Sequence, residues 1–166
     1  MAAFKARVLS PEDAEAFRAL RLSALELYPT AFLTTADEFR KRPLEDIAAR
    51  LGEGKTWGVF RETQALGIAA LLPIPYAAAA HRAEVAAFFV TPSAQGSGAA
   101  DALIEGIVDA AKETGIWQLE LFVADTNNRA RGFYARHGFV AQGRLPNAAL
   151  VDGVMTSDTF MTADLR

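Results

Sequence analysis

The sequence predicts a mixed α/β fold, of the α+β kind, in which a mostly antiparallel sheet carries helices on its faces. Segments with the alternating or continuous apolar residues typical of strands recur along the chain, and segments with apolar residues at helical spacing lie between them. The expected order is strand, helices, three strands, helix, strand, helix and two strands. No repeat or polar linker divides this order, so we expect one domain over residues 1–166.

The first third of the chain predicts one strand and three helices. Residues 4–9 have strand character. Residues 10–13, Ser-Pro-Glu-Asp, combine an N-cap, a proline at the first helical position and an acidic third position, which together start a helix. That helix should end before Pro29. Further helices are indicated at residues 35–38 and 43–51.

The rest of the chain alternates strands with two longer helices. The remaining strands are expected at residues 56–61, 66–74, 83–90, 118–123, 139–144 and 154–164. The remaining helices are expected at residues 98–114 and 127–136. Short connections join the first three of these strands, which predicts an antiparallel meander. Pro146 and Gly153 predict a loop before the final strand.

Composition excludes several classes of function. Of 166 residues, 17 are Lys or Arg and 20 are Asp or Glu, so the net charge of −3 leaves no excess of positive charge to bind nucleic acid. The chain has no Cys, which removes thiolate nucleophiles, disulfides and sulfur-based zinc sites. It also lacks the motifs of zinc proteases and serine hydrolases. We expect neither a nucleic-acid partner nor a metal.

The hydrophobic segments do not predict a membrane protein. The first residues contain no apolar region typical of a signal peptide. The longest uncharged stretch, residues 66–80, contains Pro73 and Pro75 and is shorter than the roughly 18 to 20 residues that span a bilayer. The expected location is cytoplasmic, without membrane association.

A glycine-containing loop at residues 90–100 joins a strand directly to an amphipathic helix. Gly96 and Gly98 let the backbone approach a ligand closely, and the free N–H groups at the helix start favour an anion such as a pyrophosphate. The alternative is that the glycines bind no ligand and only allow the chain to reverse its direction. The loop lacks the Lys-Ser/Thr of a nucleoside-triphosphate loop and the pattern of a dinucleotide loop, which disfavours a nucleotide-binding protein.

Two motifs occur in the same order and on the expected elements. The first, Gln/Arg-x-x-Gly-x-Gly/Ala, is matched by Gln95, Gly98 and Ala100. The second, Asn-x-x-Ala-x-x-x-Tyr-x-x-x-Gly-Phe, is matched by Asn127, Ala130, Tyr134, Gly138 and Phe139. Over residues 54–145 the chain thereby resembles the GNAT superfamily of acyl-CoA-dependent N-acyltransferases. The resemblance implies a GNAT-like fold of about seven strands, splayed between the fourth and fifth, with acetyl-CoA in the gap.

The resemblance also implies which residues contact acetyl-CoA. Main-chain groups of Phe89 and Val90 would meet the pantetheine arm and the thioester carbonyl, like an added strand. Asn127 would lie near the CoA arm, and it is also expected to cap the helix that it starts. Backbone amides of the loop would hold the pyrophosphate, at Gln95, Gly96, Ser97, Gly98, Ala99 and Ala100.

Tyr134 is the candidate general acid. The resemblance places it beside the CoA sulfur, where a phenol, with a pKa of about 10 in peptides, can protonate a departing thiolate. The alternative is a tyrosine that only packs between Phe133 and Phe139.

Glu84 is the candidate general base. It precedes Gln95 by eleven positions, an offset at which several members of the superfamily carry this base. A partly buried carboxylate with a raised pKa could take the proton of an amine directly or through water. Alternatively, Glu84 is a charged residue at a strand start whose carboxylate is satisfied by Arg82 or by water. Glu120 is a second candidate for the base or for a contact with the acceptor.

Together these features predict an enzyme, an N-acetyltransferase that moves the acetyl group of acetyl-CoA to a primary amine of a small molecule or peptide. The amine would attack directly in a ternary complex. A CoA-binding module or regulator without turnover is the alternative. Phe122 stands where ribosomal-protein N-terminal acetyltransferases usually have Glu, which disfavours that acceptor. Residues 25–35 and 145–154 should form the acceptor side without identifying the amine, and the sequence leaves a monomer and a homodimer open.

Overall fold

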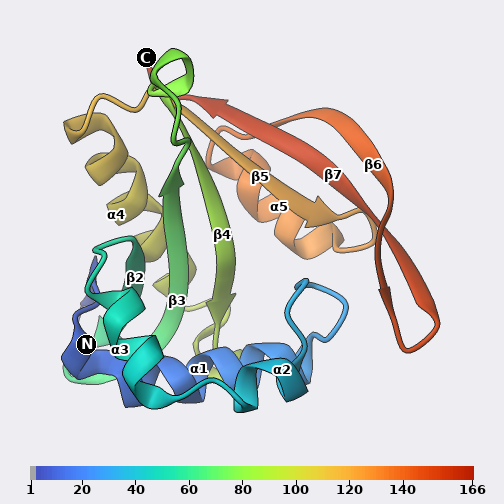
Figure 1. Cartoon of the computed structure of the whole chain (residues 1–166). Helices are drawn as coiled ribbons and strands as arrows, with labels where there is room; N and C mark the ends of the chain where they lie inside the picture. Colours follow the sequence, from blue (N-terminus) through green and yellow to red (C-terminus); the bar gives the residue numbers. More distant parts are fainter. Residues whose placement is uncertain (1–2) are drawn as a thin grey trace.

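Seven strands form one mixed sheet in the order β1-β2-β3-β4-β5-β7-β6 in the computed structural model, which describes residues 3–166 (Figure 1). Neighbouring strands run antiparallel except β4 and β5, which are parallel. The predicted fold class is therefore confirmed. The strands are β1 (Phe4–Val8), β2 (Thr56–Arg61), β3 (Gln64–Pro73), β4 (Arg82–Val90), β5 (Gln118–Ala124), β6 (Val140–Val151) and β7 (Val154–Asp164).

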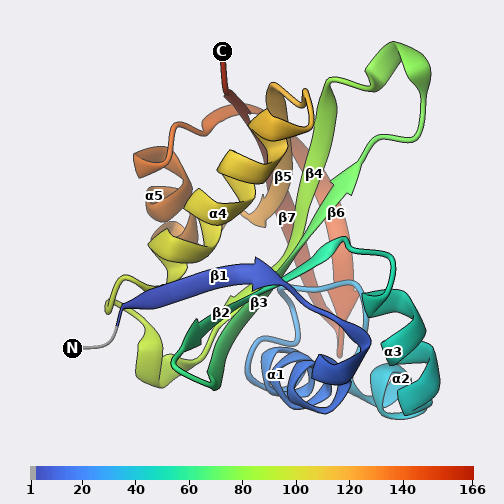
Figure 2. The same ribbon diagram turned by 90° about the vertical axis from the view of Figure 1, so that its left-hand side faces the viewer.

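Helices cover both faces of the sheet, with α1, α2 and α3 on one face and α4 and α5 on the other (Figure 2). Within the described residues, no helix is both long and apolar enough to cross a membrane. The helices are α1 (Ala14–Leu27), α2 (Ala36–Arg40), α3 (Leu44–Leu51), α4 (Ala99–Glu113) and α5 (Asn128–Arg136), with short 3-10 turns at Pro11–Asp13, Ala77–Ala79 and Pro92–Ala94.

Two hydrophobic cores lie on the two faces, because successive side chains of a strand point to opposite sides. Val59 and Ala69 pack with α4, whereas their neighbours Phe60 and Ile68 pack with α1, α2 and α3. The sheet is thus buried on both faces in its first half. Packing on both faces places β3 and β4 beside the loop that follows β4.

The start of the first helical segment follows the predicted capping pattern. The Ser10 backbone N–H donates to the Asp13 carboxylate at 2.8 Å, and Arg7 forms an ion pair with the same carboxylate. The hydrogen bonds from Arg7 are the main reason that the pKa of Asp13 is lowered to about 2. The helix ends at Leu27, before Pro29, as predicted.

The segment 145–151 is a strand, so the predicted loop at residues 145–153 is wrong. It continues β6, which pairs with β7 in a long hairpin closed by Asp152 and Gly153, both with positive φ. Pro146 fits because β6 is an edge strand and its register shifts between Leu145 and Ala149, so that no ladder donor is needed there. A proline that would break a central strand is compatible with this edge.

The sheet opens between β4 and β5. Their pairing covers Arg82–Glu84 and Gln118–Glu120 only, and the strands then diverge (Figure 1). At the junction the Arg82 guanidinium donates to both carboxylate oxygens of Glu120, at 2.9 and 2.7 Å. Beyond it, β4 shifts register against β3 and Ala87 takes a positive φ of 52°, which marks a β-bulge. The resulting edge of β4 is open toward the gap.

Candidate active site

The loop after β4 presents its backbone to open space. Gly96 and Gly98 have φ values of 73° and 98°, and Gly98 is the N-cap of α4. A Cβ at Gly96 would meet no atom within 4 Å. The first turn of α4 has N–H groups without intrahelical acceptors. The loop is therefore suited to an anion that approaches the backbone closely.

Not every predicted loop residue turns its side chain to this space. The Ser97 hydroxyl donates to the Ala94 carbonyl at 2.5 Å, and Ala99 is fully buried in the core. Neither residue lines the cavity that begins at this loop, which is bordered by Gln95, Gly96, Gly98 and Ala100. The Gln95 amide nitrogen donates to the Val90 carbonyl at 3.3 Å, and its oxygen accepts from Arg129 at 2.8 Å. Gln95 thereby ties the loop to β4 and α5.

A cavity of about 610 Å³ begins at this loop, and we call it the loop cavity. It extends along Phe88, Phe89 and Val90 of β4 to the first turns of α5. Arg129 and Arg136 also line it and add positive charge beside the loop. The sequence analysis missed these two arginines, although their spacing of seven residues on a helix beside the glycine loop was a usable signal.

Asn127 and Tyr134 lie where the loop cavity meets a second cavity. The Asn127 side chain accepts from the Ala130 N–H at 3.1 Å, which confirms the predicted helix cap. The Tyr134 ring packs edge-on against Phe88 and Phe139. Its hydroxyl has no hydrogen-bond partner within residues 3–166, and burial raises its pKa far above the usual value. Tyr134 therefore stays protonated at ordinary pH.

The second cavity, which we call the central cavity, has a volume of about 480 Å³. Leu33 and Leu145 line it, so the two segments expected on the acceptor side do meet there. Glu84 faces the same space. Burial, followed by the negative charge of Glu120, raises the pKa of Glu84. The loop and central cavities share six lining residues, Ala31, Phe32, Phe88, Asn127, Ala130 and Tyr134.

Two further carboxylates differ in their access to the central cavity. Asp158 lines it, and burial together with the charge of Asp125 raises the Asp158 pKa. The sequence analysis missed Asp158, because only the pairing of β7 brings it here. Glu120 is buried and bound to Arg82, and it does not line the cavity. Arg82, which the sequence suggested as a partner of Glu84, thus pairs with Glu120 instead.

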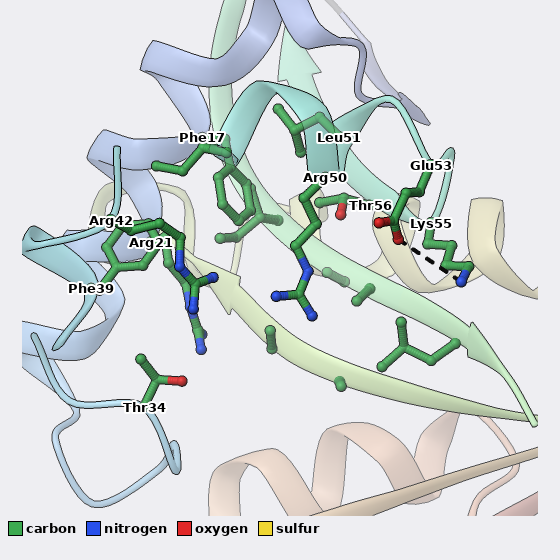
Figure 3. A pocket seen from close by; sticks show the side chains of 17 residues that line it. Phe17, Arg21, Thr34, Phe39, Arg42, Arg50, Leu51, Glu53, Lys55 and Thr56 are labelled. Carbon is green, nitrogen blue, oxygen red and sulfur yellow. Dashed lines mark ion pairs between the residues drawn. The ribbon is translucent and has the colours of Figure 1, made fainter. Parts of the chain in front are cut away.

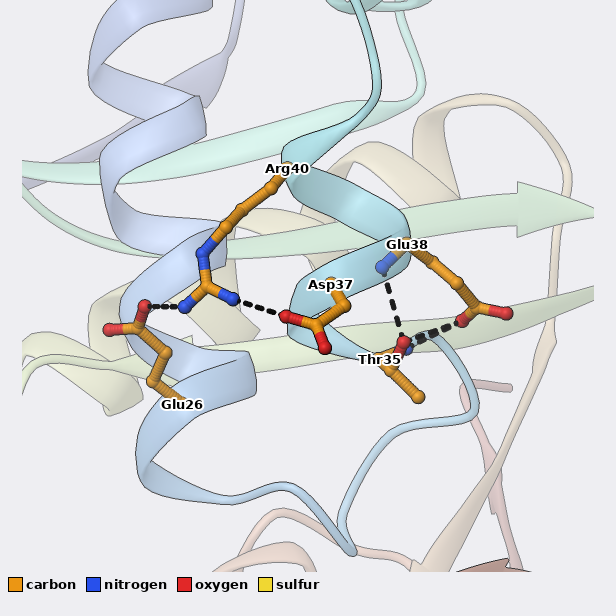
Figure 4. A network of polar contacts seen from close by, with 5 residues as sticks. All are labelled: Glu26, Thr35, Asp37, Glu38 and Arg40. Atoms are coloured by element: carbon orange, nitrogen blue, oxygen red, sulfur yellow. Dashed lines mark hydrogen bonds and ion pairs between the residues drawn. The ribbon is translucent and has the colours of Figure 1, made fainter.

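A polar network fixes the segment between α1 and α2, which forms one wall of the central cavity (Figure 4). The Thr35 backbone N–H donates to the Glu38 carboxylate at 2.8 Å, and the Glu38 N–H donates back to the Thr35 hydroxyl at 3.2 Å. Arg40 forms ion pairs with Glu26 of α1 and Asp37 of α2. These contacts anchor both ends of the wall.

The family of the chain follows from its sequence. The model of the acetyltransferase (GNAT) family matches residues 17–139, which is more than half of the chain. The chain belongs to the GNAT acetyltransferase family. The matched residues include the glycine loop, Glu84 and Tyr134, so the predicted resemblance is confirmed. No curated protein sequence matches this GNAT chain.

Solved structures show the same fold at low sequence identity. A GNAT-family acetyltransferase from Streptococcus pneumoniae is 20% identical, with a TM-score of 0.86 over 98% of this chain and 99% of that one. The protein yncA from Salmonella typhimurium, solved with acetyl-CoA, is 18% identical, with a TM-score of 0.85 over 99% and 95%. A ribosomal-protein-alanine N-acetyltransferase from Brucella melitensis is 22% identical, with a TM-score of 0.79 over 96% and 99%.

The residues of this GNAT chain fit an acyl-CoA. The glycine loop leaves room against its backbone for a pyrophosphate, and Arg129 and Arg136 supply positive charge next to it. The open edge of β4 offers unpaired main-chain groups to an amide-containing arm. Within residues 3–166 no group of three or more potential ligand side chains could hold a metal ion.

Proposed function

We propose that this GNAT acetyltransferase moves the acetyl group of acetyl-CoA to a primary amine of a small molecule or peptide within a ternary complex. The observation that carries the proposal is the junction of the loop and central cavities at Tyr134. A thioester that enters from the glycine loop and an amine that enters from the central cavity would meet there. Their contact needs no covalent enzyme intermediate.

The proposed contacts with acetyl-CoA follow the loop cavity. Backbone amides of the loop hold the pyrophosphate, while main-chain groups of Phe89 and Val90 meet the pantetheine arm. Asn127 keeps its cap and borders the arm. The loop residues in this role are Gln95, Gly96, Ser97, Gly98, Ala99 and Ala100.

The proposed chemistry uses two side chains of the junction. The amine nitrogen bonds to the thioester carbonyl carbon and passes a proton to Glu84 directly or through water. The carbon–sulfur bond then breaks, and the Tyr134 hydroxyl gives its proton to the leaving sulfur. The products are an N-acetyl amide and CoA with a free thiol. Glu84 then releases its proton to the solvent, and Tyr134 takes one up from the solvent, which restores both side chains for the next turnover.

The choice of Glu84 as the base rests on access and on charge. Glu84 lines the central cavity, whereas Glu120 is engaged by Arg82 outside it. The raised pKa brings Glu84 closer to the range in which a carboxylate accepts protons efficiently at neutral pH. Phe122 is half-exposed at 50% and lines the cavity without offering an acceptor for a proton, so we propose an amine other than a ribosomal α-amine.

Release of free thiol from acetyl-CoA in the presence of a panel of amines tests the proposal. We expect amine-dependent thiol release with the acetylated amine as product, detected by mass spectrometry. Binding of CoA without thiol release for any amine would instead indicate a CoA-binding module or regulator. The access of Glu84 to the central cavity favours turnover over that alternative.

A further inference from the structure

A third cavity, of about 270 Å³, lies between α1, α3 and the face of β3 and β4 (Figure 3). Arg21 of α1, Arg42 before α3 and Arg50 of α3 line it, and we call it the arginine cavity. The carboxylate among its lining residues is Glu53, which pairs with Lys55 at 3.9 Å. Three guanidinium groups thus face one small space that contains no carboxylate partner for them in the described part of the chain.

Arg21 is half-buried, and one of its guanidinium nitrogens is the most enclosed charged atom of the group. Its Nη1 is fully buried and has no hydrogen-bond partner among residues 3–166. Native proteins pair nearly all buried polar groups, so the unpaired Nη1 leaves a donor available to a water, an ion or an acidic group of a ligand. The Arg21 Cζ lies over the Phe32 ring, 4.7 Å from its centroid, which is a cation–π contact that helps to hold the side chain in place.

The charges of the cavity favour an anion. Burial, followed by the charges of Arg42 and Arg50, lowers the Arg21 pKa to about 10, so Arg21 remains protonated at neutral pH. Repulsion among the three cations would be relieved by a bound negative charge. A guanidinium edge matches two oxygen atoms of a carboxylate, phosphonate or phosphate group.

The arginine cavity is continuous with the central cavity. Arg21, Thr34, Ala86 and Ala87 line both. The two alanines lie at the β4 bulge, two and three residues after Glu84, and their small side chains leave the passage open. One molecule can therefore present one end to Glu84 and another end to Arg21.

We propose that the arginine cavity binds an acidic group of the acceptor, so that the substrate is an amine that also carries a carboxylate or a phosphate-type group. This inference rests on the proposed acetyl transfer to an amine in the central cavity. The guanidinium of Arg21 binds the acidic group, with Arg42 and Arg50 completing the positive field, and this contact points the amine toward Glu84.

Matched pairs of amines test the inference by thiol release. L-Phenylalanine is compared with L-phenylalaninamide, and O-phosphoethanolamine with ethanolamine, so that the two pairs separate a carboxylate from a phosphate. We expect at least one acidic member to exceed its neutral partner in kcat/KM by about tenfold, a difference of about 1.4 kcal/mol. Arg21→Gln should abolish this preference by raising KM for the acidic amine. Equal use of acidic and neutral members by the wild type would overturn the inference.

Arg18→Gln is the matched control, because Arg18 lies on the same helix and lines none of the three cavities. It should keep the wild-type preference. Should Arg21→Gln fail to fold, Arg50→Gln replaces it, since Arg50 is exposed. Arg50→Gln should weaken the preference, and an unchanged preference in that variant would count against the site.

Inorganic phosphate separates this inference from acetyl transfer itself. Thermal unfolding is followed at constant ionic strength with saturating CoA, which occupies the glycine loop. We expect phosphate to raise the Tm of the wild type and not that of Arg21→Gln. Thiol release without acidic preference, combined with no phosphate effect, would refute the anion site alone. A phosphate effect that depends on Arg21, combined with no thiol release from any amine, would support the anion site and refute the proposed acetyl transfer.

Discussion

Burial raises the pKa values of Glu84 and Tyr134, and the same cause has opposite chemical consequences for the two residues. A carboxylate with a raised pKa is a stronger base. A phenol with a raised pKa keeps its proton throughout the neutral range. The raised pKa therefore makes Glu84 a stronger base, whereas it keeps Tyr134 protonated but makes its phenol a weaker acid, so the proposed role of Tyr134 rests on its position at the junction of the two cavities.

Replacement of Glu84 by Gln should lower kcat/KM by on the order of 10² at neutral pH, because the isosteric amide cannot accept the amine proton. The wild-type rate should fall as pH decreases through the raised pKa of Glu84, where the carboxylate becomes protonated. The variant should approach the wild type at alkaline pH, where the amine arrives neutral. Asp158→Asn is the control and should keep the acidic limb of the pH–rate profile. Loss of that limb in Asp158→Asn, with an unchanged Glu84→Gln profile, would move the base to β7.

Replacement of Tyr134 by Phe should lower kcat by on the order of 10² and leave acetyl-CoA affinity nearly unchanged. The ring keeps its contacts with Phe88 and Phe139, and the deleted hydroxyl has no partner within the described residues. The free energy of unfolding should therefore also stay close to that of the wild type. Steady-state kinetics and calorimetric titration measure both effects. An unchanged kcat would show that Tyr134 only packs.

At the scale of elements, the site depends on irregularities at the end of β4. The bulge at Ala87 shifts the strand's register, and the positive φ angles at Gly96 and Gly98 turn the loop into α4. The divergence of β4 from β5 then exposes the strand edge. Each irregularity costs local hydrogen bonds or restricts the backbone. Together they leave free main-chain donors and acceptors along one groove.

Replacement of Gly98 by Val should weaken CoA binding by on the order of tenfold or more, equivalent to at least about 1.4 kcal/mol. The branched side chain would block the approach of a phosphate to the loop amides. Gly115→Val is the matched control, because Gly115 also has a positive φ, 80°, but lies beyond the other end of α4. Both variants should lose stability from backbone strain. Equal CoA affinity in the two variants would remove the loop from the site.

At the scale of the whole molecule, the sheet consists of two halves joined at a short parallel junction. The first half, β1 to β4, is buried between α1, α2 and α3 on one face and α4 on the other. The second half, β5 to β7, leaves the junction at an angle (Figure 1). The loop and central cavities are lined by residues on both sides of the junction. The binding site therefore exists only in the folded protein, and a ligand there does not bind the unfolded chain.

Acetyl-CoA should therefore stabilise the protein against unfolding. A ligand that binds only the native state contributes about 2.7 kcal/mol at 100 times its dissociation constant. We expect the Tm to rise with CoA concentration, while adenosine at the same concentration has little effect because it lacks the pyrophosphate and the pantetheine arm. Thermal unfolding measures the shift. A response to ATP but not to millimolar CoA would contradict the assigned ligand.

Local pattern determined most elements and the family motifs. The capping sequence at residues 10–13, the glycines beside α4 and the spacing from Asn127 to Phe139 act over a few neighbouring residues, so one sequence suffices to interpret them. The hairpin of β6 and β7 was the exception, because local pattern predicted a loop where β6 continues. Pro146 argues for a loop by local rules, and only the position of β6 at the sheet edge makes a strand compatible with it.

Tertiary structure decided which charges meet. From the sequence we expected Arg82 as a possible partner of Glu84, but the parallel register of β4 and β5 brought Arg82 to Glu120 and left Glu84 facing the central cavity. Asp158 reached the same cavity through the pairing of β7 with β5. Arg21 has no local feature that distinguishes it from the other arginines of its helix. Its isolation arises because α1, α3 and the sheet enclose it without an anion, and such long-range enclosure is not encoded in any short stretch of sequence.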